Sequence, residues 1–330
     1  MTSRRFTLGL AIIAAIVLAA AILLGPVAID PVAAVQAIFS QGDAAVRTIL
    51  IDIRLPRAVA ALLAGSALGV SGAALQALLR NPLAEPGVLG VSASATTAAT
   101  GAIYFGLASL GAWVVPIASL AGALAATIIL TGAAMRLRGV ASLLLLGIAL
   151  TAFAGAVMAL FVNLAPNPFS LSDLINWTAG SVANRDWNDC ATSAPFILGG
   201  ILVLLTQRRH LSLLLLGDEA AFSHGLDLRR TRLAIVIGTG LATAGSVALA
   251  GMIGFVGLVA PHAVRFFLRQ DAGASLIPAA GMGGLLTLIA DLGVRIFPWG
   301  NALHLGTIAA LVGAPIFLLL VLRWGNVRHG

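Results

Sequence analysis

The chain alternates between long apolar runs and short polar islands, and most of the apolar runs are long enough to cross a membrane as helices. About 20 consecutive apolar residues span the hydrocarbon core of a bilayer. We therefore predict an all-α polytopic membrane protein, with residues 1–330 forming one transmembrane domain of ten spans. The predicted spans are residues 6–24, 58–79, 88–107, 112–135, 141–164, 191–206, two helices within 233–264, 275–296 and 305–322.

The run 233–264 is the one place where a single apolar stretch predicts two helices. It contains no Arg, Lys, Asp or Glu. As one straight helix it would measure roughly 48 Å, which exceeds a bilayer core of about 30 Å. Glycines at 251, 254 and 257 and a proline at 261 favour a break between two helices.

Small residues on the second predicted span indicate a close helix contact. Gly65 and Gly69 form a G-x-x-x-G pattern, and Ser71 and Gly72 continue the same small face. Small residues let two helix backbones approach each other in a membrane. We expect this span to pack tightly on a neighbouring helix.

Two polar islands, at about 29–53 and 165–190, are predicted to be periplasmic. Asp30 followed by Pro31 is typical of a helix start, and we expect a short interfacial helix there. In the second island, Ser170 and Asp173 form an S-x-x-D capping pattern, which predicts a helix beginning at Ser170.

The most charged run of the chain, GDEAAFSHGLDLRRTR, lies in a predicted cytoplasmic loop at about 207–232. Asp218 and Glu219 open a predicted short helix, Gly225 breaks it, and a second short helix is expected to end in arginines. Acids at a helix start and bases at its end suit the helix dipole. The run is either an ordinary loop or a docking surface for a soluble partner.

Composition excludes several classes of function. Charged residues make up 9% and apolar residues 60% of the chain, and mean hydropathy is +1.05, so no soluble domain of useful size is expected. All 19 basic residues are arginines, and without lysine the chain has neither a Walker A ATPase loop nor a Schiff-base nucleophile. The single Cys190 permits no intrachain disulfide and no cysteine-based metal site.

The arginines support this topology with both chain ends in the cytoplasm. Fourteen fall on the predicted inside and five on the outside, as the positive-inside rule requires, so the net charge of +7 does not indicate nucleic-acid binding. Three outside exceptions, Arg54, Arg57 and Arg295, lie at span ends. They either extend to lipid phosphates or form a basic rim that binds carboxylates of an outside partner. The inside set is Arg4, Arg5, Arg80, Arg136, Arg138, Arg208, Arg209, Arg229, Arg230, Arg232, Arg265, Arg269, Arg323 and Arg328.

Three stretches resemble the FecCD family, the permeases of type II ABC importers for ferric siderophores, haem and cobalamin. They are RLPRAVAALLAGSALGVSGAALQALLRNPLAEPGVLGVS at 54–92, LGDEAAFSHGLDLRRTR at 216–232 and GMIGFVGLVAPHAVR at 251–265. The resemblance implies a homodimer of ten-helix subunits in the bacterial inner membrane. It also implies two separate ATPase subunits, which bind ATP and Mg, and a periplasmic binding protein. On this basis the chain itself is not an enzyme and holds no cofactor or metal.

The resemblance also assigns roles to residues of this sequence. Arg54, Arg57 and Arg295 would bind acidic residues of the binding protein. Asn81 and Leu83 match a cytoplasmic gate, and the usual polar pair of a second gate is replaced by Val140 and Ala141. The fifth and tenth spans would line the translocation path. Coupling to the ATPase would involve Asp218, Glu219, Ala220, Ala221, Gly225, Arg229 and Arg230.

Substrate identity is the least determined feature. His304 replaces part of the usual outer-mouth pattern, where it either contacts a metal chelate or is an ordinary packed or solvated histidine. Together with the WTAGS segment, Trp177–Ser181, it favours haem slightly over ferric siderophores, and cobalamin is the alternative.

Two other classes of membrane protein fit the sequence less well than an importer does. An ion-coupled secondary transporter usually needs ionisable groups at mid-membrane. The only acid well inside a predicted span is Asp291, which an i,i+4 ion pair with Arg295 explains. An intramembrane hydrolase would need a catalytic motif, and the sequence contains neither H-E-x-x-H nor G-x-S-x-G.

Overall fold

The computed structural model describes residues 3–27, 29–39, 43–136, 140–268, 272–296 and 303–327, and all regular structure in these ranges is helical. Three short segments are a π-helix, η1 (Ile49–Arg54), and two 3₁₀ turns, η2 (Pro86–Leu89) and η3 (Leu107–Leu110). The α-helices are α1 (Ser3–Leu23), α2 (Pro31–Ile38), α3 (Ala44–Thr48), α4 (Leu55–Leu78), α5 (Val91–Tyr104), α6 (Val114–Arg136), α7 (Val140–Asn163), α8 (Pro168–Thr178), α9 (Trp187–Thr206), α10 (Arg208–Leu214), α11 (Asp218–Ser223), α12 (Leu228–Ala250), α13 (Val256–Leu268), α14 (Ala272–Ile296) and α15 (Leu305–Val327).

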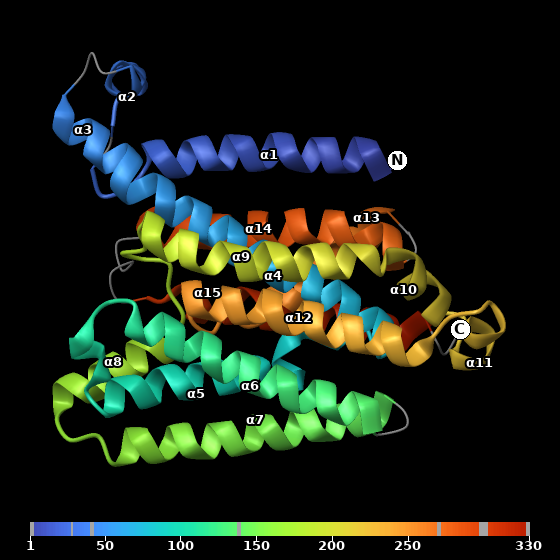
Figure 1. The fold of residues 1–330 in the computed structure, drawn as a ribbon. Helices are drawn as coiled ribbons and strands as arrows, with labels where there is room; N and C mark the ends of the chain where they lie inside the picture. The colour runs from blue at the N-terminus through green and yellow to red at the C-terminus, as the bar shows by residue number, and fades with distance from the viewer. Residues whose placement is uncertain are drawn as a thin grey trace.

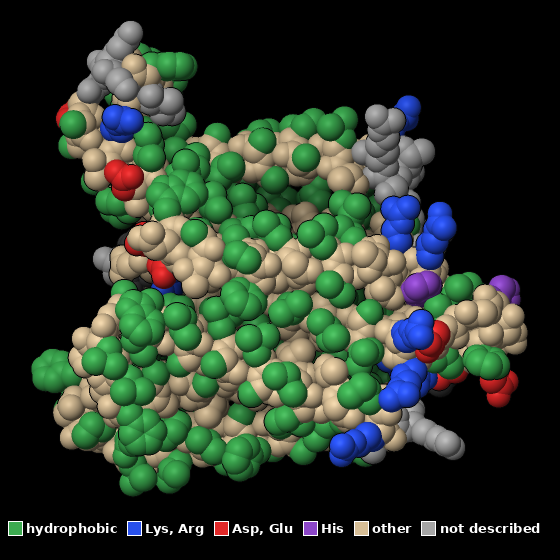
Figure 2. Space-filling model, viewed as in Figure 1, with side chains coloured by type: hydrophobic (Ala, Val, Ile, Leu, Met, Phe, Trp, Pro, Cys, Tyr) green, Lys and Arg blue, Asp and Glu red, His purple; other side chains and the backbone are tan. Residues whose placement is uncertain are grey.

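The long helices lie side by side in one bundle, with α1 and α7 on opposite sides (Figure 1). Of the long apolar helices, α4 and α12 are the most buried, and α1 and α7 are the least. Short helices α2, α3 and α8 lie at one end of the bundle, and α10 and α11 lie at the other (Figure 1). Apolar side chains cover the sides of the bundle, whereas charged side chains gather at its two ends (Figure 2).

Seven helices in the described ranges are long and apolar enough to cross a membrane: α1, the continuous helix 44–78, α6, α7, α9, α12 and α14. The apolar helix α13 and the described apolar part of α15, 305–315, are shorter, and α5 has 14 residues. A helix coincides with each predicted span, so the prediction of an all-helical, multi-span membrane protein is confirmed.

The predicted break in the run 233–264 is confirmed and is narrower than expected. Helix α12 ends at Ala250 and α13 begins at Val256. Gly251 takes a positive φ of 68° at the end of α12, where a Cβ would lie 2.8 Å from the Trp177 carbonyl oxygen. Phe255 also has a positive φ, of 64°. The glycine at 257 and the proline at 261 belong to α13 and do not contribute to the break.

The predicted close contact of the G-x-x-x-G face is confirmed, and the neighbouring helix is α14. A Cβ on Gly65 would collide with the carbonyl oxygen of Gly283, and one on Gly69 with that of Ala279. One turn further, Gly72 lies against the backbone of Gly257 in α13. The backbones therefore touch without intervening side chains.

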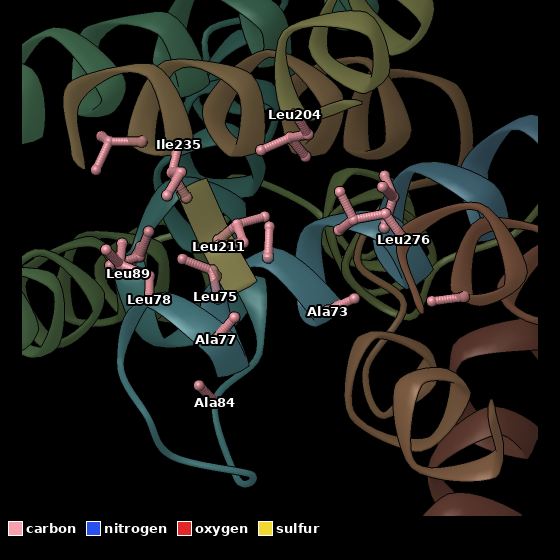
Figure 3. Packing of buried hydrophobic residues seen from close by; sticks show 14 of the residues in the cluster. Ala73, Leu75, Ala77, Leu78, Ala84, Leu89, Leu204, Leu211, Ile235 and Leu276 are labelled. Atoms are coloured by element: carbon pink, nitrogen blue, oxygen red, sulfur yellow. The ribbon is translucent and has the colours of Figure 1, made fainter. Parts of the chain in front are cut away.

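A leucine-rich core joins α4 to its neighbours near α10 (Figure 3). Leu75 of α4, Leu204 of α9, Leu211 of α10, Ile235 of α12 and Leu276 of α14 are all fully buried. This core anchors α10, the helix that leads into α11.

The N-caps of α2 and α8 test the two predicted helix starts in the polar islands. Asp30 is the N-cap of α2, with Pro31 in its first turn, as predicted. The predicted start at Ser170 is wrong, because α8 begins at Pro168. Asn167 is its N-cap and accepts a hydrogen bond of 2.8 Å from the Ser170 backbone nitrogen. An Asn N-cap followed by Pro defines a helix start, so Ser170 falls inside the first turn.

The segment limits predicted for the loops also change. Helix 44–78 begins inside the predicted island 29–53, and α9 begins at Trp187, inside the predicted island 165–190. The predicted second short helix of the charged loop does not exist as a separate element. Its residues form the first turns of α12, which runs on to Ala250.

Arg229 and Arg230 therefore lie at the start of a long helix and not at the end of a short one. Positive charge there opposes the helix dipole. Asp227 offsets this, because its carboxylate accepts a 3.0 Å hydrogen bond from the Arg230 backbone nitrogen and pairs with the Arg230 guanidinium at 3.1 Å.

Candidate functional site

The described arginines divide between the two ends of the bundle (Figure 2). We call the end that carries α10 and α11 the basic end, and the end that carries α2, α3 and α8 the opposite end. The sorting agrees with the inside and outside sets predicted from the sequence. Arg138, Arg269 and Arg328 lie outside the described residues, as do the side chains of Arg4 and Arg323. At the basic end are Arg5, Arg80, Arg136, Arg208, Arg209, Arg229, Arg230, Arg232 and Arg265, and at the opposite end are Arg47, Arg54, Arg57, Arg185 and Arg295.

Helix α11 holds most of the candidate coupling residues at the basic end. Asp218 and Glu219 form its first turn, Ala221 faces inward and is fully buried, and Gly225 follows the helix with a positive φ of 80°. Sequence reasoning missed Phe222, whose side chain is 71% exposed. The only signal in the sequence was a large apolar residue within the most charged run of the chain.

Asp218 joins α11 to two other elements. Its Oδ1 lies 3.3 Å from Arg80 Nη2, in the turn after α4. Its Oδ2 pairs with Nη2 of Arg232 in α12. Arg80 has a positive φ of 47°, and the next residue, Asn81, accepts a 2.9 Å hydrogen bond from the Leu83 backbone nitrogen. The candidate gate turn is thereby tied to the candidate coupling helix.

The two candidate gate segments are connected through η2. Val140 and Ala141 form the first turn of α7, while Leu83 is 44% exposed in the turn after α4. Helix α7 packs against η2 where a Cβ on Gly147 would collide with the Val88 carbonyl oxygen. The structure places both segments near the basic end. Their role as gates stays a prediction.

Glu85 is a partly buried acid that sequence reasoning missed because it lies in a predicted turn. The turn folds back into the bundle, and the Phe255 backbone N–H donates a hydrogen bond to the Glu85 carboxylate. Both residues line a cavity of about 390 Å³, with Leu68 and Thr307 on its walls. The turn after α4 therefore contacts the break between α12 and α13 as well as α11.

At the opposite end, the three candidate docking arginines are bound inside the chain. Arg57 Nη2 lies 2.8 Å from Oδ1 of Asp291, and Arg295 Nε lies 3.2 Å from Oδ2 of the same carboxylate. The predicted i,i+4 ion pair is thus confirmed, with a second arginine added. Arg54 is 5% exposed and donates to the carbonyl oxygens of Ile22 at 2.8 Å, of Leu23 at 2.7 Å and of Val27.

His304 lines a cavity of about 690 Å³ at the opposite end together with Trp177 and Ser181, the first and last residues of the WTAGS segment. Arg185 lies over the Trp177 ring at 5.1 Å from its centroid and pairs with Asp189 at 3.9 Å. Burial lowers the pKa of the Arg185 guanidinium, while the Asp189 charge acts in the opposite direction. His304 also borders a second cavity of about 340 Å³ with Arg57 and Arg295.

Within the described ranges, no group of three or more His, Cys, Asp or Glu side chains could hold a metal ion. Cys190 is buried in α9, where its thiol lies 3.5 Å from the Pro56 carbonyl oxygen. In the part of the chain that the structure describes, the two ends therefore present ion pairs, cavities and separate histidines, among them His210, His224 and His304.

Comparison with known proteins decides the family. Residues 12–323 match the FecCD transport family. The chain belongs to this family. Its relatives include the vitamin B12 import system permease protein BtuC of Salmonella typhi, 38% identical over 272 residues, or 82% of this chain and 83% of the relative. The ABC transporter permease protein YvrB of Bacillus subtilis is 36% identical over 280 residues, 83% of this chain and 79% of the relative.

The fold of this FecCD permease also matches a solved structure described as an inward-facing "putative metal-chelate type ABC transporter". The TM-score is 0.83 at 25% identity, covering 97% of this chain and 99% of the solved one. The chain is thus an ABC-importer permease subunit with no catalytic site or cofactor of its own, and ATP binds to a separate ATPase. The importer class implies ATPase and binding-protein partners.

Proposed function

We propose that this permease forms a homodimer of ten-helix subunits that moves a metal chelate from the periplasm to the cytoplasm by alternating access. The cavity of about 690 Å³ at the opposite end, with His304 on its wall, is the observation that carries this proposal. The basic end would face the cytoplasm with both termini, because arginines are retained on that side.

Helix α11 is proposed to enter a groove on the ATPase. Its exposed Phe222 and Glu219 offer an apolar anchor and a charge, and Gly225 permits the sharp turn that ends it. The Asp218 ion pairs support transmission of ATPase motion to the turn that holds Asn81 and Leu83. With Val140 and Ala141 on the other side, closure would rely on apolar contact and not on hydrogen bonding.

The arginine cluster at the opposite end is proposed as the docking point for a binding protein. Arg57 and Arg295 share one carboxylate, so with Asp291 they carry a net charge of +1. A carboxylate of the partner would be attracted to that surplus charge and could pair bidentately with a guanidinium. Arg57 is the more accessible of the pair, with 19% of its side chain exposed against 5% for Arg295. Arg57→Gln should therefore weaken docking while leaving ATPase assembly intact.

We propose haem or a ferric siderophore as the substrate, since His304 and Trp177 line the same cavity. Neutral imidazole is a common ligand for metals, and an indole ring provides a flat apolar surface for a macrocycle. Cobalamin is the second candidate, and the likeness to relatives named as vitamin B12 permeases supports it.

Ligand-stimulated ATPase activity in liposomes tests this function. The permease would be reconstituted with its cognate ATPase and binding protein, then challenged in turn with haem, ferric siderophores and cobalamin. Stimulation and uptake with one ligand identify the substrate. Failure of the ATPase to assemble, with uptake driven by an ion gradient alone, would refute the importer mechanism in favour of a secondary transporter.

A further inference from the structure

A groove of about 790 Å³ runs between α1, α9, α10 and α14 on the side of the bundle away from α7. In Figure 2 the surface is hollowed below α1, and basic side chains gather at the right-hand end of this hollow. Leu8, Ala11, Leu205 and Ile277 line the groove along its length. Its basic end is lined by Arg208 and Arg209.

The long walls of this groove face hydrocarbon in a bilayer. Helix α1 is among the least buried of the long helices, and Leu8 and Ile277 are 63% and 53% exposed. Water in such an apolar recess would lose hydrogen bonds without replacement, whereas an acyl chain loses none. The groove is therefore shaped for a chain of the membrane itself.

The two arginines at the basic end add selectivity to this apolar recess. Neither Arg208 nor Arg209 forms an ion pair with a carboxylate in the described part of the chain. Gly273 of α14 lies so close to the Arg208 carbonyl oxygen that no Cβ would fit between them. This contact, with buried Leu211 in the core, holds the start of α10 against α14.

We infer that this groove binds one membrane phospholipid with an anionic head group. The phosphate would pair with the guanidinium groups of Arg208 and Arg209, which match phosphate oxygens in a bidentate way. One acyl chain would lie against Leu8, Ala11 and Ile277. Basic pockets between helices on the cytoplasmic side of a membrane select acidic lipids in this way. The inference requires only that the chain spans a membrane with its basic end inside.

Native mass spectrometry of the purified full-length permease tests the inference, with phosphatidylglycerol, cardiolipin or phosphatidylcholine added to detergent-solubilised protein. Arg208→Gln combined with Arg209→Gln is compared with Arg136→Gln combined with Arg229→Gln. The control pair is also exposed at the basic end but does not line the groove. We expect the wild-type permease to retain one anionic lipid and the groove variant to bind it roughly 20- to 30-fold more weakly. This factor corresponds to about 1 kcal/mol of binding free energy for each of the two arginines.

A second pair of variants tests the apolar part. Ala11→Trp fills the groove, whereas Ala19→Trp adds the same side chain two turns away on the exposed side of α1. We expect Ala11→Trp to lose the retained lipid and Ala19→Trp to keep it. If the groove variant and the control variant lose the same amount of anionic lipid, the bound lipid is only annular. The same conclusion follows if the wild-type permease retains phosphatidylcholine as well as the anionic lipids. Conversion of a dimer to a monomer by Ala11→Trp without a change in bound lipid would assign the groove to a second copy of the chain.

Discussion

The ion cluster of Asp291 offers the sharpest test of how the opposite end is held together. Asp291 is 1% exposed, and its two oxygens face Arg57 at 2.8 Å and Arg295 at 3.2 Å. Asp291→Asn keeps the shape and removes the charge, which leaves two guanidinium groups without a counter-charge. Loss of one partner from a buried ion pair costs about 3–5 kcal/mol. At the lower end of the usual scaling, the midpoint of thermal unfolding should fall by roughly 6–10 °C.

The chain supplies its own probe for this measurement. Cys190 is the only cysteine and is buried, so a thiol-reactive fluorogenic dye reports unfolding without further labelling. Asp227→Asn is the matched control, because its ion pair with Arg230 is exposed and Asn still caps α12. Exposed pairs contribute about 1 kcal/mol or less, so its midpoint should move by less than roughly 2–3 °C.

A double-mutant cycle separates the charge from other effects of the substitution. Adding Arg57→Gln to Asp291→Asn lowers the net charge of the cluster from +2 to the +1 of the wild type, and should restore part of the lost stability. A midpoint for Asp291→Asn as close to wild type as that of the Asp227→Asn control would refute the reasoning. It would show that the cluster is solvated in the membrane-embedded protein.

Three further predictions concern the basic end and the central contact. Asp218→Arg should uncouple ligand-stimulated ATPase activity from uptake while the ATPase still binds, and Arg80→Asp in the same chain should restore uptake. An unchanged ratio of uptake to ATP hydrolysis in the single variant would reject the Arg80–Asp218 linkage. Gly72→Leu should abolish folding in the membrane, measured as loss of a monodisperse peak in size exclusion, because its Cβ would collide with Gly257; a normal peak would contradict the close packing. Phe222→Ala should weaken ATPase binding in a pull-down by roughly tenfold, as for a buried aromatic anchor worth about 1–2 kcal/mol, and equal capture would exclude that anchor.

Sequence reasoning identified the features that depend on patterns along one helix. Apolar runs located the helices, the small face at Gly65 and Gly69 predicted the backbone contact, and the i,i+4 spacing predicted the Asp291–Arg295 pair. Sequence reasoning failed where a second local motif competed with the expected one, or where the contact joins residues far apart in the chain. Asn167 with Pro168 displaced the cap expected at Ser170. The second arginine on Asp291 comes from a helix 234 positions away, which no local spacing reveals.

The candidate site also has features that the sequence predicts and features that it does not. Family resemblance assigned coupling and docking roles to residues that the structure places at opposite ends of the bundle, and these roles stay predictions. The contacts of Asp218 and Glu85 were not predictable, because both depend on how the turn after α4 folds back towards α11 and towards the break before α13. Exposure of Phe222 is likewise a property of the folded surface and not of the residue pattern.

The contacts of Gly65, Gly69 and Gly72 also determine which parts of this permease can move. If α4 slid by one residue along α14, a residue with a side chain would take the place of Gly65 or Gly69, where not even a Cβ fits against α14. Helices α4, α13 and α14 therefore travel as one rigid body, in the way that interlocked surfaces without slack do. Conformational change must then be absorbed around this body, at the Gly251–Phe255 break and by α1 and α7, the least buried of the long helices.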